Sequence, residues 1–268
     1  MTEVSGHNEA AYDALDVGEY ADAAPHLQHA FIIALYRELL DRAFQIASRA
    51  AKSGEVLALD LGAGDGTATR PMLQRGAHVV AVDVSQNQLS QLQAHCVGYG
   101  DRLAVRCEDV EVVLRERSRH HIVVANSFLH HVPDYLSLLE NAAACVAECG
   151  ILLTFQDPVW KPSMSRRDAW FSALAYNLWR LSRPDVIGGV WRRLRRMAGV
   201  WSEHSVHDMT EFHAIRDGVN QNRIQTLLEQ HGFDCEVSLY CSCQGAWFQR
   251  LGERLGVRNT FAILAVKR

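Results

Sequence analysis

Three closely spaced glycines follow an apolar stretch of the sequence. The run 56–61 leads into Gly62, Gly64 and Gly66, and an acid, Asp60, lies two positions before the first of them. Glycine lets the backbone approach a ligand without a side-chain clash, and the start of a helix offers unpaired N–H groups to a polar or anionic group. The spacing therefore predicts a turn that binds a polar small molecule.

Further acids end the next two apolar runs. Asp83 lies 21 residues beyond Gly62, and Glu108 and Asp109 end the run after that. An acid at the tip of a strand can accept hydrogen bonds from both hydroxyls of a ribose. The turn and the acids together favour a ligand that contains a ribose.

The elements that must position these residues alternate regularly along the chain. Alternating strands and helices predict a parallel sheet with helices on both faces and ligands at the carboxyl ends of the strands. We expect seven strands, near 56–62, 78–84, 103–110, 121–127, 150–157, 235–242 and 260–267. Helices are expected near 25–51, 67–74, 86–95, 135–148 and 222–230. A connecting segment that contains Trp247 and Phe248 joins the last two strands.

This constellation resembles the class I S-adenosylmethionine-dependent methyltransferases over roughly residues 55–158 and the terminal strands. The resemblance implies an α/β fold with a doubly wound, Rossmann-like, mostly parallel sheet of order 3-2-1-4-5-7-6, and S-adenosylmethionine as cofactor. In that family the glycine turn passes the amino acid end of the cofactor, the second-strand acid holds the ribose, and the third-strand acid meets the adenine amino group. Carried onto this chain, the implied cofactor-binding residues are Asp60, Gly62, Ala63, Gly64, Asp83, Val84, Glu108, Asp109, Val110, Asn126, Ser127 and Tyr20.

The sequence departs from the family pattern in two places. Glu108 stands where a glycine is common, and His120-His121 replace the usual Phe-Asp at the start of the fourth strand. A nicotinamide-dependent oxidoreductase remains an alternative, because a dinucleotide-binding domain uses the same logic of strand, turn and acid. A non-catalytic relative that binds a membrane or a protein is a second alternative.

Candidate catalytic residues follow the fourth and fifth strands. Methyl transfer needs an acceptor in line with a good leaving group, and a hydroxyl acceptor usually also needs a base. We name His131, His130 and Asp157 for this role; the alternatives are structural histidines and a turn-forming Asp157. Oxygen is the favoured acceptor atom, with nitrogen and carbon open. A metal-assisted branch of the family carries carboxylates where this chain has Ser127 and His130, so no metal site is expected.

The stretch 158–201 is longer than the family core requires. It carries nine Lys and Arg residues against two Asp, and five of the six tryptophans. Apolar side chains at helical spacing predict a helical lid within an insertion at 158–220. Trp160 and Trp170 would contact an apolar or ring-bearing acceptor, and arginines such as Arg192 and Arg193 would pair with its carboxylate or phosphate. Two helices that merely pack on the core, and a peripheral contact with an anionic membrane, are the alternatives.

A cluster of histidines and acids follows this stretch, at 203–217. We assign His207 and His213 to the acceptor pocket, with a role as base also open. Zinc is the weaker alternative, because the histidine spacing lacks a clear fourth ligand. At the other end of the chain, residues 1–52 are predicted to form a helical flap in which Tyr20 or its neighbours close the cofactor site, ahead of a methyltransferase domain at 53–268.

The composition sets the outer limits of these interpretations. A chain of 268 residues with 48% hydrophobic residues suits one core with an appended cap. No run is long enough to span a membrane and no secretion signal opens the sequence, so we expect a cytoplasmic location. The seven scattered cysteines are interpreted as ordinary thiols, with a metal or redox role for Cys241 and Cys243 as the alternative. The net charge of −4 argues against a nucleic-acid partner, and the oligomeric state, a homodimer included, stays open.

Overall fold

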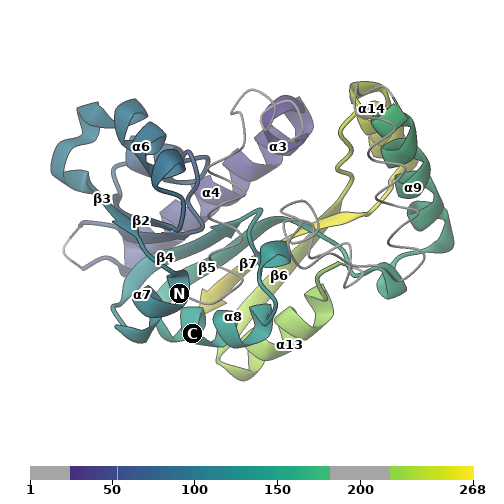
Figure 1. The fold of residues 1–268 in the computed structure, drawn as a ribbon. Coiled ribbons are helices and arrows are strands. Elements are labelled where there is room, and N and C mark those ends of the chain that lie inside the picture. Colours follow the sequence, from purple (N-terminus) through teal and green to yellow (C-terminus); the bar gives the residue numbers. More distant parts are fainter. Residues whose placement is uncertain (1–24, 53, 182–217) are drawn as a thin grey trace.

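A computed structural model of the chain describes residues 25–52, 54–181 and 218–268. Within these residues, a seven-stranded sheet has the order β3-β2-β1-β4-β5-β7-β6 (Figure 1). Neighbours from β3 to β5 are parallel, whereas β7 runs antiparallel to both β5 and β6. The predicted fold class and strand order are therefore confirmed. The strands are β1 (Leu57–Leu61), β2 (His78–Asp83), β3 (Leu103–Cys107), β4 (His120–Asn126), β5 (Val146–Pro158), β6 (Phe233–Tyr240) and β7 (Thr260–Lys267).

Helices cover both faces of the sheet and divide the core into two layers. On one face lie α4 (Ala30–Ala50), α5 (Thr69–Gln74) and α6 (Gln86–His95), preceded by the short α3 (Pro25–Gln28). On the other lie α7 (Val110–Arg115), α8 (Tyr135–Ala144) and α13 (Gln221–Gln230). In the central strands, buried apolar residues at alternate positions face these two layers in turn, as a sheet buried on both sides requires.

The long helix α4 is the described part of the predicted flap. Its buried side chains recur at helical spacing, and they pack on the middle of the sheet. They are Ile32, Tyr36, Leu39, Leu40, Ala43 and Ala47. The flap residue Tyr20 lies outside the described residues, as do the predicted lid arginines Arg192 and Arg193.

Three elements differ from the expected ones, and the first is α7, a helix that begins at Val110, where the expected third strand ends. The helix α8 ends at Ala144, because β5 begins at Val146, whose neighbour in the sheet is His120 of β4. The segment expected to connect the last two strands is a regular helix, α14 (Ala246–Leu255). Its Gln249 and Gly252 face inward, and its Trp247 faces solvent.

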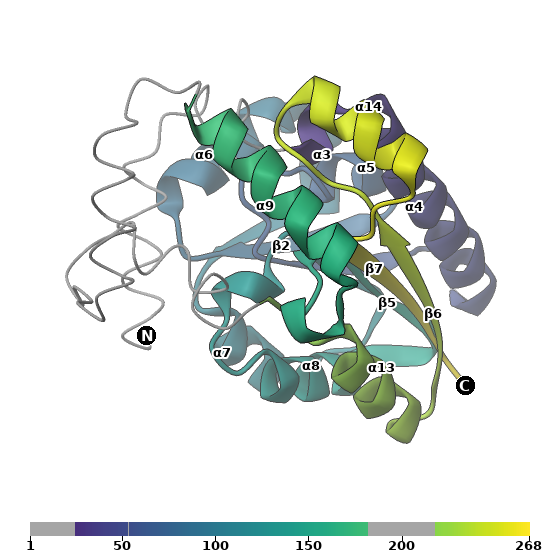
Figure 2. The same ribbon diagram turned by 90° about the vertical axis from the view of Figure 1, so that its right-hand side faces the viewer.

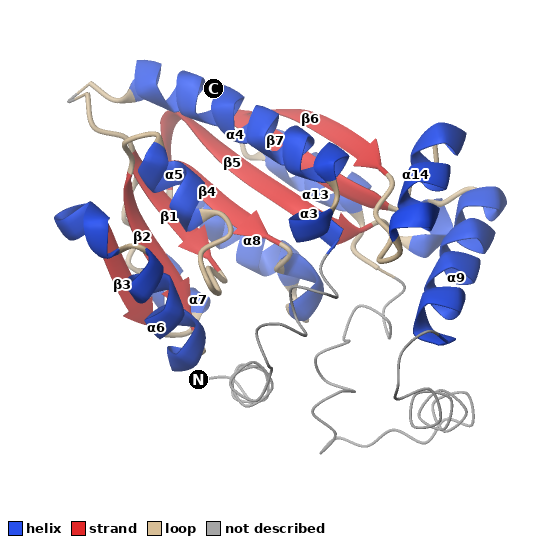
Figure 3. Ribbon diagram, turned by 90° about the horizontal axis from the view of Figure 1, so that it is seen from above, coloured by secondary structure: helices blue, strands red, loops and turns tan. Residues whose placement is uncertain are grey.

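Helix α14 lies beside α9 (Arg166–Leu181), which follows β5, and we call this pair the arm. Both helices stand beyond one end of the sheet (Figures 2 and 3). A small separate core joins them, formed by Phe171, Ala175, Cys241, Cys243 and Val257. Arg167 of α9 also donates a hydrogen bond to the carbonyl of Leu255 at the end of α14.

Three short 3₁₀ turns complete the described structure: η1 (Val97–Arg102), η2 (Leu129–His131) and η3 (Lys161–Ser163). Of these, η2 directly follows β4 and places two histidines at the carboxyl edge of the sheet. Within the described ranges, none of the helices combines the length and the apolar character that crossing a bilayer demands.

Candidate active site

The glycine turn after β1 is held tightly against its neighbours. The N–H groups of Gly62 and Ala63 both donate to the carbonyl of Val82, at 2.9 Å each. Gly62 has φ +70°, and a Cβ built there would lie 2.2 Å from Cδ2 of Phe128. Glycine is therefore required at this position by both backbone conformation and space.

Asp83, at the end of β2, is hydrogen-bonded to the glycine turn. One of its carboxylate oxygens accepts a hydrogen bond from the N–H of Gly64, and the other from the N–H of Ser85, both at 2.9 Å. A carboxylate oxygen can accept more than one hydrogen bond, so a side chain in this position also suits the hydroxyl groups of a ligand.

A cavity of about 340 Å³ opens at this edge of the sheet, within the size range of small-molecule sites. It lies at the carboxyl ends of β1, β2, β3 and β4. Nine of the twelve proposed cofactor residues line it: Gly62, Ala63, Gly64, Asp83, Val84, Asp109, Val110, Asn126 and Ser127. Tyr20 lies outside the described residues.

Asp60 lies behind the cavity instead of lining it. Its side chain is buried, and one oxygen accepts a hydrogen bond from the hydroxyl of Thr69 at 2.6 Å. Burial raises the pKa of Asp60 to about 7, against the opposing effect of the Thr69 hydrogen bond. We therefore reassign Asp60 to supporting the start of the glycine turn and α5.

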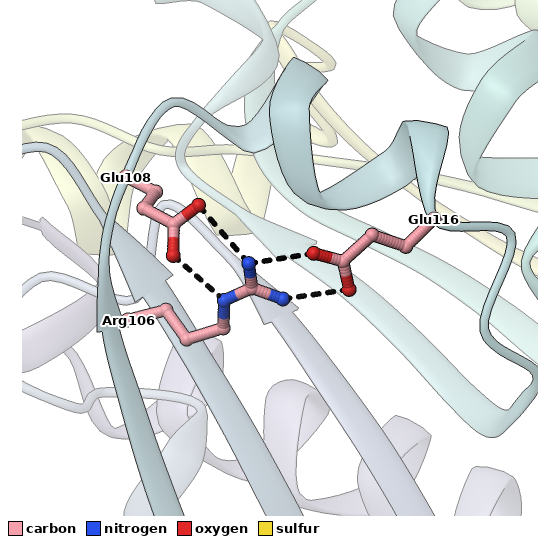
Figure 4. A network of polar contacts seen from close by, with 3 residues as sticks. All are labelled: Arg106, Glu108 and Glu116. Carbon is pink, nitrogen blue, oxygen red and sulfur yellow. Dashed lines mark hydrogen bonds and ion pairs between the residues drawn. The ribbon is translucent and has the colours of Figure 1, made fainter.

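The side chain of Glu108 takes part in an ion-pair network with Arg106 and Glu116 (Figure 4). Arg106 of β3 donates two hydrogen bonds to Glu108, at 2.9 and 3.0 Å, and two to Glu116, both at 2.7 Å. Glu108 is absent from the cavity wall. Its neighbour Asp109 does line the cavity and caps α7 by accepting from the N–H of Glu111 at 3.0 Å.

The end of β4 supplies two polar groups to the cavity. Ser127 has a positive φ of 53°, and its N–H donates to the carbonyl of Phe155 at 2.7 Å. The side-chain oxygen of Asn126 is buried and accepts no hydrogen bond from any described residue. A buried acceptor of this kind suits a donor group on a ligand.

The candidate catalytic residues come together beside the cavity. Asp157 accepts two hydrogen bonds from His130, one from the backbone N–H at 3.1 Å and one from Nδ1 at 2.8 Å. The ring of His131, which lines the cavity, lies 4.0 Å from the ring of His130, centre to centre. Asp157 is fully buried, so the pair is shielded from water on the carboxylate side.

The aromatic residues proposed for the acceptor lie elsewhere. Trp160 borders a separate groove between α8 and α13, together with Leu136, Asn220 and Arg223. The side chain of Trp170 on α9 faces solvent. Neither lines the cavity, whereas His207 and His213 fall outside the described residues.

Several residues that line the cavity are not predicted from the sequence. Four of them, Asp65, Glu111, Phe128 and Val132, directly follow a predicted residue in the chain, so sequence proximity is a signal for these four. Gln88 is different, because it reaches the cavity from the first turn of α6. The additional lining residues are Asp65, Thr67, Gln88, Glu111, Phe128, Val132, Pro133, Asp134 and Leu138. The described part of the chain has no group of three or more His, Cys, Asp or Glu side chains arranged to hold a metal ion.

Comparison with known proteins agrees with this geometry. Residues 59–152 match the family model described as a methyltransferase domain. The fold and the cavity at the carboxyl edge define the chain as having the class I S-adenosylmethionine-dependent methyltransferase architecture.

Particular relatives match the same part of the chain. A ubiquinone biosynthesis O-methyltransferase of Nitrosomonas europaea is 32% identical over 97 residues, covering 36% of this chain and 41% of the relative. Its counterpart in Hahella chejuensis is 35% identical over 111 residues, covering 41% and 46%. The chain thus spans less than half the length of these curated relatives.

Solved structures match over a greater length and at lower identity. The magnesium protoporphyrin IX methyltransferase of Synechocystis PCC 6803, crystallised with S-adenosylmethionine, has a TM-score of 0.57 at 12% identity and covers 100% of this chain and 99% of its own. A methyltransferase of Archaeoglobus fulgidus has a TM-score of 0.54 at 14% identity, covering 87% and 94%. At these identities the likeness establishes the fold.

Proposed function

We propose that this chain binds S-adenosylmethionine in the cavity and methylates an oxygen atom of a small molecule. The observation that carries the proposal is the convergence of the glycine turn, Asp83 and Asp109 on one cavity at the carboxyl edge of the sheet. The curated relatives named above are O-methyltransferases, which favours oxygen over nitrogen or carbon.

The residues around the cavity suit this cofactor chemically. Asp83 offers two carboxylate oxygens for the ribose hydroxyls, and Asp109 offers an acceptor for the adenine amino group. The buried oxygen of Asn126 suits the ammonium group of the methionyl part. Gly64 lines the cavity, and a Cβ built there would meet no protein atom within 4 Å, so the turn is open on that side. Bound S-adenosylmethionine supplies an electrophilic methyl group with a neutral leaving group.

His130 is the proposed base for the acceptor hydroxyl. An ionised Asp157 can only accept, so its contact with Nδ1 keeps the histidine proton on that nitrogen and leaves Nε2 as the basic atom. The buried carboxylate also stabilises the imidazolium that forms when Nε2 takes the proton. His131 forms the cavity wall beside the pair.

The acceptor is proposed to be partly apolar. Phe128, Val132 and Leu138 line the cavity together with His131, the neighbour of the proposed base, so this part of the cavity has an apolar wall. Such a wall favours a ring or an alkyl chain beside the reacting hydroxyl, and it leaves the charge of more distant parts of the acceptor unspecified.

Kinetics with labelled cofactor test the proposal. The protein is incubated with methyl-labelled S-adenosylmethionine and a panel of phenols and catechols, and label in the extracted product is counted. We expect His130→Gln and Asp157→Asn to lower kcat by about 10² to 10⁴-fold while the Kd for S-adenosylmethionine is unchanged. Activity of the unaltered protein should rise with pH as the base loses its proton, and His130→Gln should lose that rise.

The controls separate this proposal from its rivals. His131→Gln removes a wall residue and should change KM for the acceptor more than kcat. Full activity in both His130→Gln and Asp157→Asn would remove His130 as the base. Stabilisation by NAD(P) and not by S-adenosylmethionine in a thermal shift measurement would favour the oxidoreductase alternative.

The arm is a proposed partner surface. Trp170 and Trp247 are each 67% exposed, and Arg166, Arg250 and Arg254 are exposed on the same two helices. Tryptophan and arginine together suit the interface of an anionic membrane, where the ring contacts acyl chains and the cation contacts phosphate. A peripheral contact there would bring the cavity close to an acceptor carried in the lipid.

A further inference from the structure

Near its C-terminal end, strand β5 contains a residue that has no pairing partner on the neighbouring strand β7. Phe155 pairs with Ala262 of β7 and Asp157 pairs with Phe261, so Gln156 is an extra residue in an antiparallel ladder. Its φ of +67° lies in the left-handed region, which glycine usually occupies. An extra residue in this conformation is a β-bulge, a device that re-aims the side chains following it.

The bulge decides which face of the sheet Asp157 meets. Side chains alternate between faces along a strand, so residues two apart normally share a face. Phe155 faces α4, where its ring stacks on Tyr36 with centres 4.5 Å apart. The extra residue turns Asp157 to the opposite face, toward His130. In an unbroken strand Asp157 would share the α4 face with Phe155.

Gln156 at the bulge is hydrogen-bonded to two residues, Tyr240 and Ser242. The hydroxyl of Tyr240 donates to Oε1 of Gln156 at 3.0 Å and accepts from its backbone N–H at 3.1 Å. Nε2 of Gln156 donates to the hydroxyl of Ser242 at 2.7 Å. Both the oxygen and the nitrogen of this buried carboxamide are thereby hydrogen-bonded, one to the last residue of β6 and the other to the segment that follows β6.

These contacts continue from Gln156 into the arm. Asn259 accepts from the N–H of Ser242 at 2.8 Å and donates to its carbonyl at 3.0 Å. The same amide of Asn259 donates to the hydroxyl of Ser172 on α9 at 3.1 Å. A continuous hydrogen-bonded path thus runs from Ser172 of α9 through Asn259 and Ser242 to Gln156, the residue before Asp157.

We propose that Gln156 is a positioning residue: its carboxamide, held by Tyr240 and Ser242, keeps the β-bulge that aims Asp157 at His130. The inference deepens the proposed function, since it concerns the same pair of residues that we assign to proton removal. It does not depend on methyl transfer for its test, because the contact between Asp157 and His130 has its own spectroscopic signature.

The first measurement is NMR of the histidine side chains. A proton on His130 Nδ1 that is hydrogen-bonded to a buried carboxylate gives a downfield resonance, assigned by its loss in His130→Gln. We expect this resonance in the unaltered protein and its loss or broadening in Gln156→Leu, which keeps the side-chain size but removes both side-chain hydrogen bonds. Tyr240→Phe should have the same effect while keeping the ring that stacks on Phe155.

A matched control is Tyr99→Phe, which removes a tyrosine hydroxyl from η1, away from this network. It should leave the His130 resonance and the activity unchanged. Should Gln156→Leu fail to fold, Tyr240→Phe carries the test, because it deletes a single oxygen atom. An unchanged His130 resonance in a folded Gln156→Leu or Tyr240→Phe protein would overturn the inference.

Kinetics provide the second measurement. Misplacing Asp157 should lower kcat by up to about a hundredfold, the loss expected for a displacement of about 1 Å, with the Kd for S-adenosylmethionine unchanged. The pH profile of kcat should shift as well, because His130 loses its carboxylate partner. If His130→Gln and Asp157→Asn are fully active, the assigned base is wrong, yet the NMR result still decides whether Gln156 positions Asp157.

Discussion

At the scale of single residues, Gly62 and Phe128 show how closely the cavity wall is fitted. Phe128 lines the cavity and lies directly against the glycine turn, so the absence of a side chain at Gly62 makes room for an aromatic ring in the cavity wall. The two residues are far apart in the sequence, and β1 and β4 bring them together as parallel neighbours.

Replacing Gly62 by alanine should destabilise the protein for two reasons that a control can separate. The new Cβ would be strained at φ +70° and would also collide with Phe128. Gly76→Ala is the matched control, since its φ is +94° and a Cβ there would meet nothing within 4 Å. We expect Gly76→Ala to cost about 1–2 kcal/mol in the free energy of unfolding, and Gly62→Ala about 1–3 kcal/mol more.

Urea denaturation measures this difference in the unaltered protein, Gly62→Ala, Gly76→Ala, Phe128→Ala and the double variant of Gly62 and Phe128. Adding Phe128→Ala to Gly62→Ala should recover part of the collision cost, as a double-mutant cycle would reveal. Equal losses in Gly62→Ala and Gly76→Ala would contradict the expected collision.

The sequence predicts which residues belong to the candidate site better than it predicts the contacts between them. Asp83 and Asp109 could be placed from the position of each acid at the end of a strand. His130 and Asp157 were named separately, because their contact depends on a bulge between β5 and β7 that no local pattern announces. The aromatic character of 158–201 suggested acceptor contacts, yet Trp170 faces solvent.

At the scale of elements, the turn between β3 and α7 is fixed by the Arg106 network. This turn carries Asp109 into the cavity and keeps Glu108 out of it. Hydrogen bonding to Glu116 and Glu108 raises the pKa of Arg106, and hydrogen bonding to Arg106 lowers the pKa of Glu116. Exposed ion pairs stabilise folds little, so the network matters for geometry more than for stability.

Arg106→Gln should therefore weaken cofactor binding while leaving the fold intact. Releasing Glu108 frees a second carboxylate next to Asp109 and lets the turn move, so the Kd for S-adenosylhomocysteine should rise several-fold. Isothermal titration calorimetry measures this Kd. Arg42→Gln is the matched control, because Arg42 makes a similar two-bonded pair with Glu236 away from the cavity.

The two variants should differ only in cofactor binding. Both lose a half-buried arginine and its ion pair, so their thermal unfolding should change by similar small amounts. An equal Kd for S-adenosylhomocysteine in Arg106→Gln and the unaltered protein would mean that Asp109 is positioned without the network.

The elements themselves were predictable where a pattern was regular. Seven strands and the buried stripe of α4 follow from alternating apolar runs and helical spacing. The segment of α14 is expected only as a connection between the last two strands, because Trp247 and Phe248 obscure the pattern of an amphipathic helix that has Gly252 at its inner face. The start of β5 at Val146 depends on pairing with His120, a contact between strands that sequence spacing does not encode.

At the scale of the whole molecule, charge is divided unevenly. The total is −4, although the stretch 158–201 carries nine basic residues and only two acids, so the remainder is strongly acidic. In the described structure, α14 lies alongside α9 (Figure 2) and carries Arg250 and Arg254 against one acid, Glu253, so it adds a small basic contribution beside α9 from a distant part of the sequence. An anionic surface would therefore approach the arm and be repelled elsewhere.

Vesicle binding tests the arm as a membrane contact. The protein should sediment with vesicles containing phosphatidylserine and less with neutral phosphatidylcholine vesicles, and binding should fall as salt rises. Arg250→Gln combined with Arg254→Gln should weaken binding about thirtyfold, from about 1 kcal/mol for each basic residue. Trp170→Ala with Trp247→Ala should weaken it on both kinds of vesicle, because it removes apolar contact.

Val97→Ser is the control for that experiment, since Val97 is an apolar residue 80% exposed on η1, away from the arm. It should bind like the unaltered protein. Equal binding by the tryptophan variants, or none by the unaltered protein, would contradict the membrane contact. A mass that doubles with concentration and is lost on replacing Trp170 and Trp247 would instead assign the arm to a second copy of the chain, because two such apolar faces could cover each other.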